Sequence, residues 1–261
     1  MLQFVTSASS IQLASWVFGT IFGGAILGFV VRYFLPEHHY SKESKDASTL
    51  VAGLVATLAA LILGLLIAST KGTFDHISSL MNNVATDYVH VDRLLSDYGP
   101  EAAPIRNELR GVLELRIRTI WPEEFKKVDS VPVKQETRSG LEKIFAQVAA
   151  LKPVTPYQIT LQDLSLRLVD GILHDRWMIT VIGQGSIPPL LLVIPVIWIT
   201  FLTFLYALFA PRNLTVIVVL FFCSLSIAGA IFLIDEMATP LDGFIKVSSA
   251  PLHLALDRLG K

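Results

Sequence analysis

The sequence predicts an all-α polytopic membrane protein, with four transmembrane helices in a 2+2 arrangement around a helical extramembrane domain. Four apolar stretches lack Asp, Glu, Lys and Arg, at residues 11–31, 47–70, 177–211 and 213–234, and a polar middle separates the second from the third. Each reaches the roughly 20 residues that an α-helix needs to cross a bilayer. Backbone amides cannot bond to water inside lipid, so helices are favoured over strands.

Composition supports this prediction. Apolar residues make up 52% of the chain and charged residues 16%, below the roughly 25% charged residues of soluble domains. The net charge of −1 gives no electrostatic argument for a nucleic-acid partner. Cys223 is the only cysteine, which excludes a disulfide or a cysteine metal site within one chain. Residues 1–10 contain no Lys or Arg, so we expect the first apolar stretch to be a retained helix and not a signal peptide.

The first two spans carry small residues at helical spacing. In the first span these residues are Gly19, Gly23, Gly24 and Gly28. The second span carries a longer series, which we call the small-residue stripe: Gly53, Thr57, Ala60, Gly64 and Ala68. Small residues one turn apart let another helix approach closely. Packing of helices within the chain is one interpretation, and a pore-lining or subunit-facing role is the other.

The third stretch, at 35 residues, is too long for one straight span. Its glycines and prolines lie early, and proline removes an amide donor and clashes with the preceding turn. We therefore expect an irregular or in-plane segment over 177–187 and a spanning helix from about Pro188 to Ala210. The fourth span ends at Asp235 and Glu236, where a plain helix end and a cation-collecting pore mouth are both conceivable.

The polar middle is predicted to be helical. Apolar residues follow steps of three and four without a break from Phe74 to Tyr98, and no proline separates this seam from the second span. One helix is therefore expected to leave the membrane and continue. Further amphipathic helices are predicted over about 104–121, 136–151 and from Thr155-Pro156 onward, where a hydroxyl precedes a proline and Gln158 follows three residues later. The apolar seam from Phe74 to Tyr98 has two possible roles: packing within this helical bundle, or self-association of two chains along the seam.

Little in the sequence points to catalysis. No histidine stands in a metal-ligand spacing, and no phosphate-binding glycine loop or nucleophile elbow occurs. Asp87, His90 and Asp92 lie close on one helix, but we expect Asp87 and His90, three residues apart, to form a surface pair and no metal to bind there. Arg116 and Arg118 are expected on a solvated face. The spans carry no ionisable residue, so no buried proton relay is visible. We expect no enzyme and no cofactor.

Six segments together resemble the bacterial bestrophin-like domain family. They are LGLLIASTKGTFD at 63–75, VDRLLSDYGPEA at 91–102, TIWPE at 119–123, HDRWMI at 174–179, FAPRNLTVIVVLFFCSLSIAGAIFLI at 209–234 and DEMATPLDGFIKVSSAPLHLALDRLGK at 235–261. The chain departs from the family pattern at Ala238 and Thr239, where relatives usually carry Asp-Arg, and at Leu241, where Phe often follows the proline.

The resemblance implies kinship in layout with bestrophins, which are pentameric anion channels with two spans, a helical domain and two more spans. Two features of bestrophins are missing here. Their second span carries rings of aromatic residues, whereas residues 50–70 contain none, and the acidic calcium clasp of the animal proteins is absent.

We expect four regions: a first helix pair (1–70), a helical domain (71–178), a second pair (179–234) and a C-terminal tail (235–261). The leading functional hypothesis is a homo-oligomeric ion channel in the lipid bilayer of a bacterial inner membrane, with the small-residue stripe lining the pore and anion selectivity implied by the resemblance. Candidate charges at the pore mouth are Lys71, Arg176, Asp235, Glu236, Asp242 and Lys246. A non-conducting scaffold or sensor is the alternative, and a secondary transporter is disfavoured by the absence of intramembrane charge.

Membrane orientation stays open in the sequence. Four spans place both ends of the chain and the middle domain on one side. Arg32, Lys42 and Lys45 follow the first span and favour that loop in the cytoplasm, but Lys71 and Lys246 flank the spans on the other side.

Overall fold

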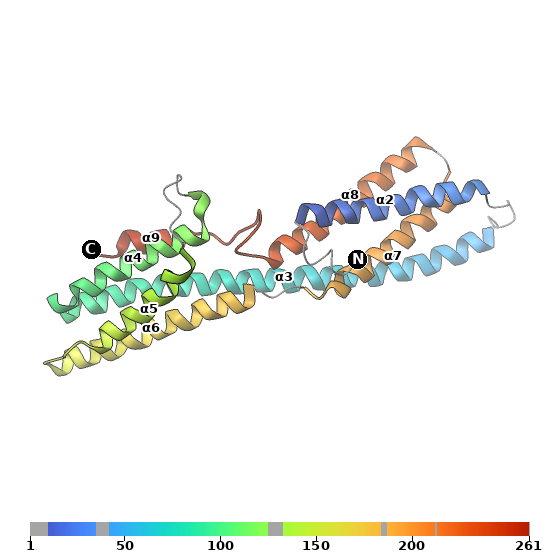
Figure 1. The fold of residues 1–261 in the computed structure, drawn as a ribbon. Helices are drawn as coiled ribbons and strands as arrows, with labels where there is room; N and C mark the ends of the chain where they lie inside the picture. The colour runs from blue at the N-terminus through green and yellow to red at the C-terminus, as the bar shows by residue number, and fades with distance from the viewer. Residues whose placement is uncertain (1–9, 35–41, 125–132, 184–186, 212, 261) are drawn as a thin grey trace. The chain divides into compact units, whose positions relative to one another are not determined.

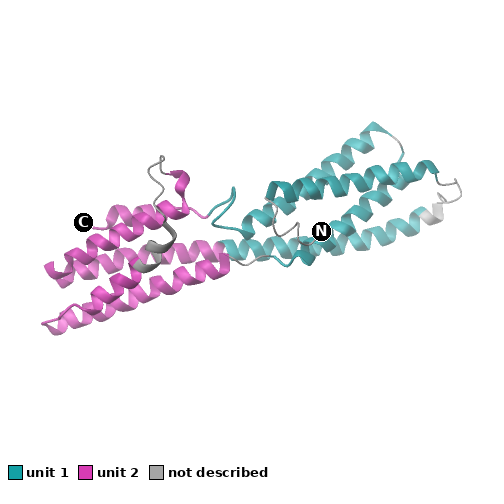
Figure 2. Ribbon diagram, in the orientation of Figure 1, with its two compact units in different colours: residues 1–74, 185–246 teal, residues 75–184, 247–261 magenta. Residues whose placement is uncertain are grey.

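The computed structural model describes residues 10–34, 42–124, 133–183, 187–211 and 213–260. These residues form helices joined by short connections, and no strand occurs among them (Figure 1). The chain divides into two compact units (Figure 2). Unit 1 comprises residues 1–74 and 185–246, and unit 2 comprises residues 75–184 and 247–261.

Four helices are long and apolar enough to cross a membrane, as the sequence predicts. They are α2 (Ser10–Phe34), the first part of α3 (Lys42–Tyr98), α7 (Pro189–Phe209) and α8 (Leu214–Ala238). Their mean hydropathies lie between 1.9 and 2.8, and the three spans other than α3 bury 28–39% of their most apolar window. The protein is a multi-pass membrane protein whose spans contact the lipid bilayer.

Two glycines of α2 allow it to pack closely on α7. A Cβ atom on Gly24 would lie 2.7 Å from the Thr200 side chain, and one on Gly28 would meet the carbonyl oxygen of Phe204. The Thr203 hydroxyl donates to the carbonyl of Ile21 across the same interface, at 3.1 Å. Packing within the chain is therefore confirmed for these two glycines, because only a residue without Cβ leaves room for the neighbouring backbone.

Helix α3 continues without interruption from unit 1 into unit 2, over 57 residues. This confirms the predicted continuity of the second span with the polar seam. In unit 2 the seam is buried inside the domain, with exposed fractions of 4% or less at Ile77, Met81, Val84, Tyr88, Val91, Leu95 and Tyr98. The seam thus serves packing within a single chain, the plainer of the two interpretations.

The rest of unit 2 is helical as predicted. Around the second part of α3 lie α4 (Ala103–Ile120), α5 (Val133–Ala149) and α6 (Pro156–Gly183), and the short α9 (Ala250–Arg258) packs on α4 (Figure 1). The start of α6 is closed by the predicted capping box. Its Thr155 hydroxyl accepts from the amide of Gln158 at 3.2 Å, and the Gln158 side chain accepts from the amide of Thr155 at 3.3 Å.

One predicted element differs from the structure. The span from Pro189 is confirmed, but residues 177–183 are the last turns of α6 and not an irregular segment. The physical reason is local: no proline occurs between Tyr157 and Gly183, so nothing stops the helix before the glycine. Residues 184–186 lie outside the described part of the chain.

Candidate functional site

The small-residue stripe lies on the open face of α3. All five of its residues are exposed. The opposite face of the same segment is buried, with 4% of Ala52, 2% of Ala59 and 6% of Leu66 exposed. Since residues three and four apart share a helix face, these two sets divide the segment into an inner and an outer side. The stripe therefore points away from the rest of this chain.

The surroundings of the two stripe glycines show how open this face is. A Cβ atom added to Gly53 or Gly64 would meet no atom within 4 Å, in contrast to Gly24 and Gly28 of α2. The Thr57 hydroxyl donates to the carbonyl of Gly53, at 2.8 Å, inside the helix. Packing within the chain, one of the two interpretations of the stripe, finds no support in these contacts.

Large apolar residues flank the stripe and are also exposed. Between 40% and 78% of the following side chains is accessible: Leu50, Val51, Leu54, Leu58, Leu61, Leu65 and Ile67. Only 17% of the most apolar window of α3 is buried, the smallest share among the four spans. The second span is thus the span with the most surface left for contacts outside its own chain.

The candidate mouth charges have different surroundings. Lys71 is exposed one turn after Ala68 on α3, with its ammonium 5.6 Å from the Phe74 ring centroid. Asp242 is exposed, whereas Asp235 and Lys246 are half-buried. These four residues belong to unit 1, and Arg176 belongs to unit 2.

Glu236 has a structural role that is not evident from the sequence: its carboxylate binds the loop that follows α8. Its side chain is 1% exposed, and one carboxylate oxygen accepts the backbone amides of Phe244 and Ile245, at 2.5 and 3.1 Å. The intervening loop turns at Pro240, as expected, and at Gly243, which has a φ of 98°. A Cβ on Gly243 would lie 2.6 Å from the same carboxylate. Glu236 therefore holds the loop after α8 in place.

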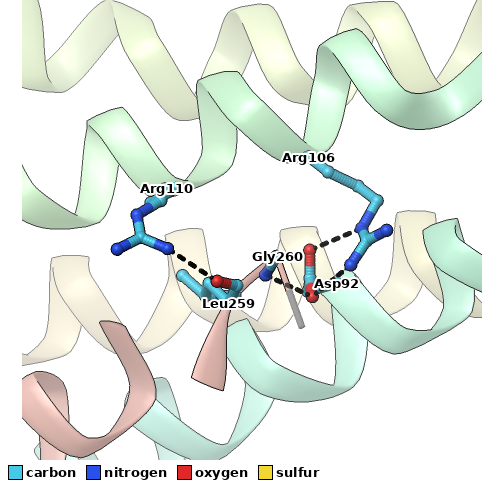
Figure 3. A network of polar contacts seen from close by, with 5 residues as sticks. All are labelled: Asp92, Arg106, Arg110, Leu259 and Gly260. Carbon is cyan, nitrogen blue, oxygen red and sulfur yellow. Dashed lines mark hydrogen bonds and ion pairs between the residues drawn. The ribbon is translucent and has the colours of Figure 1, made fainter. Parts of the chain in front are cut away.

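A second buried carboxylate organises the end of the chain. Asp92 accepts two bonds from Arg106, at 2.8 and 3.0 Å, and a third from the Gly260 amide at 3.1 Å (Figure 3). Arg110 donates to the carbonyl of Leu259 at 2.8 Å (Figure 3). Asp92 is 5% exposed, and these three bonds satisfy its buried carboxylate.

The chain end is also held at the other end of α4. The Trp121 indole donates to the carbonyl of Val247 at 3.1 Å. Glu124 accepts from the Ser249 hydroxyl at 2.6 Å and contacts the His253 ring at 2.8 Å. The Ser249 hydroxyl above all, and then His253, lower the pKa of Glu124 from its ordinary value. In the described residues, no group of three His, Cys, Asp or Glu side chains forms a metal-binding cluster.

Comparison with known proteins identifies the family. Residues 19–252 match the profile of the Bestrophin-like domain. The chain belongs to the bestrophin-like family. No curated protein matches this bestrophin-like chain in sequence.

Solved structures share the fold of this bestrophin-like protein. A mutant of a bacterial bestrophin homologue from Klebsiella pneumoniae is similar with a TM-score of 0.63 and 14% identity, over 94% of this chain and 96% of that chain. A second mutant of that homologue has a TM-score of 0.64 and 12% identity, over 94% and 96%. A structure described as a membrane protein reaches a TM-score of 0.65 at 12% identity, over 94% and 97%.

One of the departures from the family pattern, at Ala238 and Thr239, lies where α8 ends. Ala238 is 8% exposed and Thr239 follows the last turn, where its hydroxyl donates to the carbonyl of Asp235 at 3.4 Å. Both positions come just after Glu236, whose carboxylate keeps its two backbone bonds without an Asp-Arg pair.

Proposed function

We propose that this bestrophin-like protein is a homo-oligomeric ion channel of a bacterial inner membrane, in which the small-residue stripe of α3 lines a central axis. The observation that carries the proposal is the exposure of all five stripe residues on an apolar span. In a closed ring each subunit presents the same surface to the axis. Membership of the bestrophin-like family supports the proposal that ions pass along this axis.

Side-chain size favours a passage along this face. The stripe carries no side chain larger than threonine, so its surface leaves room beside the helix. The glycine positions would tolerate side chains without any clash inside the chain. A bulky residue there would extend into the space that the proposed axis occupies.

The resemblance to bestrophins leads us to expect a preference for anions. Charged residues near the stripe would strengthen or weaken this preference. Lys71 follows the stripe on the same helix, and its positive charge favours anions. Asp242 is exposed and opposes them, whereas the Glu236 carboxylate is occupied by two backbone amides. Reversal potentials in a salt gradient measure the preference. Lys71→Gln should shift selectivity toward cations and Asp242→Asn toward anions.

The decisive experiment measures ion flux from purified protein in liposomes and oligomer mass by native mass spectrometry. Gly64→Trp should retain the oligomer and reduce flux at least tenfold, because the indole fills the axis. Gly229→Trp is the matched control: this glycine of α8 is also exposed with no atom near its Cβ position. It should leave flux unchanged.

Two outcomes contradict the proposal. If Gly64→Trp dissociates the oligomer, the stripe is a subunit contact and not a lining. If the intact wild-type oligomer conducts no ion, the protein is a scaffold or sensor whose helical domain binds a partner.

A further inference from the structure

A cleft of about 340 Å³ lies between the start of α3 and the end of α7, within unit 1. Further along, the two helices share an apolar core, in which Ala59 and Leu66 of α3 join Leu192 and Val196 of α7 (Figure 1). Sites that hold small molecules in proteins have volumes of roughly 300–1,000 Å³. The cleft is therefore large enough to hold part of a ligand.

The position of the cleft in the sequence places it at the membrane surface. Lys45 and Pro211 both line it. The uncharged stretch of α3 begins two residues after Lys45, at Ala47, and the uncharged stretch that contains α7 ends at Pro211. Uncharged stretches of spanning helices end where the hydrocarbon layer meets the lipid headgroups. Two such ends from distant parts of the sequence meet at this cleft, which therefore lies at headgroup level.

The polar part of the lining can bind a negatively charged group. Lys45 contributes a positive charge, and Ser48 and Tyr206 contribute hydroxyl groups that can donate hydrogen bonds. Thr49 also lines the cleft, but its hydroxyl already donates to the carbonyl of Lys45, at 2.8 Å. Asp46, the next residue after Lys45, is exposed and does not line the cleft. The charge that the lining carries is therefore positive.

The rest of the lining is apolar and restricts the kind of ligand. Leu205 and Phe209 of α7 and Ala52 of α3 lie beside the polar groups. A small free anion would gain nothing from these side chains, since a charge is costly to place against apolar surface. A phospholipid satisfies both parts of the lining, because it joins a charged phosphate to apolar acyl chains. The surrounding bilayer supplies such molecules at high local concentration.

We propose that this cleft binds an anionic phospholipid. Its phosphate lies beside Lys45, Ser48 and Tyr206, and the beginning of its acyl chains lies against Leu205 and Phe209. Lysine at a membrane surface attracts acidic lipids, and hydrogen bonds to a charged phosphate are stronger than those between neutral groups. The inference goes beyond the proposed channel function and does not depend on conduction.

The test titrates phosphatidylglycerol and phosphatidylcholine separately against the purified full chain in detergent. Native mass spectrometry measures the bound lipid, and the melting temperature reports the stabilisation that binding causes. The wild type should bind phosphatidylglycerol more tightly and melt at a higher temperature with it. Lys45→Gln should weaken the binding of phosphatidylglycerol about fivefold, the contribution of one basic residue near an acidic membrane, and leave that of phosphatidylcholine unchanged.

Two further variants complete the test. Lys152→Gln is the matched control, because it removes the same charge from an exposed position of unit 2 and should bind both lipids like the wild type. Ser48→Phe should lose phosphatidylglycerol and keep the oligomer mass of the wild type, since its ring fills the cleft. Inorganic phosphate at constant ionic strength should leave the melting temperature unchanged, because it has no acyl chains.

Four results overturn the proposal. Equal binding of phosphatidylglycerol by the wild type and Lys45→Gln excludes the predicted contact with the headgroup, and unchanged binding by Ser48→Phe excludes the cleft. A phosphate response equal to that of phosphatidylglycerol assigns the cleft to a free anion. A smaller oligomer mass of Ser48→Phe assigns it to a second copy of the chain. If Ser48→Phe does not fold, the comparison of Lys45→Gln with Lys152→Gln decides.

Discussion

At the residue scale, Glu236 separates what an acidic side chain suggests in a sequence from what it does in the fold. Next to Asp235 at the end of a span it looks like a charge at a pore mouth. In the structure it accepts two backbone amides from a loop eight and nine residues further on. Sequence spacing alone could not predict this, because the contact depends on how the chain turns at Gly243.

Replacing Glu236 by Gln should lower the stability of unit 1 by about 1–3 kcal/mol, because the charge-assisted bonds of a buried carboxylate to two backbone amides are weakened. The melting temperature in detergent measures the effect. Asp242→Asn removes an exposed carboxylate of the same loop and serves as the control. An equal response of the two variants would show that the Glu236 carboxylate does not hold the loop.

The glycines of α2 allow a second residue-scale prediction. Gly28→Ala should destabilise the protein by about 1–3 kcal/mol, because its Cβ would meet the Phe204 carbonyl, which cannot move independently of α7. Gly23→Ala should be neutral or stabilising, since its Cβ would meet no atom within 4 Å. Thermal unfolding of both variants checks the pair. The spacing of the α2 glycines predicts close helix packing, but not that Gly24 and Gly28 make the contact while Gly19 and Gly23 do not.

At the element scale, the seam of α3 could be predicted because a step of three and four residues has one geometrical solution, a helix with one apolar face. Val84→Asp should destabilise unit 2 by several kcal/mol, as Val84 is 4% exposed and burying a carboxylate is costly. Asn83→Asp, on the exposed side of the same turn, is the control. Equal melting temperatures for the two variants would contradict a buried seam.

The contact between α4 and α5 includes a carboxylate with a lowered pKa, and we expect it to depend on pH. Glu108 of α4 accepts from Lys143 at 2.7 Å and from Gln147 at 2.8 Å on α5. Lys143 first, and then Gln147, lower the pKa of Glu108. A lowered carboxylate pKa stabilises the fold above the unfolded value of about 4.3, and this stability is lost as the pH falls through the folded value.

Unfolding at a series of pH values from about 5 to 3 should therefore show Glu108→Gln losing less stability than the wild type. The difference should stay within about 1 kcal/mol, since 64% of the Lys143 side chain is exposed and the pair is screened by water. Parallel pH profiles for the two proteins would exclude this role of Glu108.

Two features of the fold differ from, or go beyond, what local sequence predicts. The glycines and prolines early in the third apolar stretch predict an irregular segment over 177–187, whereas α6 continues to Gly183. The packing of α9 and of the last residues on α4 could not be predicted, because no local sequence pattern indicates it. The pairs that make it, such as Trp121 with Val247, lie more than a hundred residues apart.

At the scale of the whole molecule, four spans fix the topology that the sequence predicts. After Cys223→Ser removes the only cysteine, new cysteines at Asn213 and at Glu101 should react with a membrane-impermeant maleimide from opposite sides of the membrane. Asn213 lies in the connection between α7 and α8, and Glu101 follows α3. Labelling of intact cells and of inverted vesicles assigns the sides. Reaction of both sites from one side would contradict the four-span arrangement.

The open face of α3 also bears on how the protein is made. An exposed apolar face in water would drive aggregation, but lipid tails solvate it as well as protein does. With a mean hydropathy of 2.8 and only 17% of its most apolar window buried, the second span is stable in the bilayer without neighbours. If the protein assembles as proposed, newly inserted subunits therefore persist as separate, diffusing monomers. Their encounter, at a rate set by their density in the membrane, would then become the step that controls how many assemblies a cell contains.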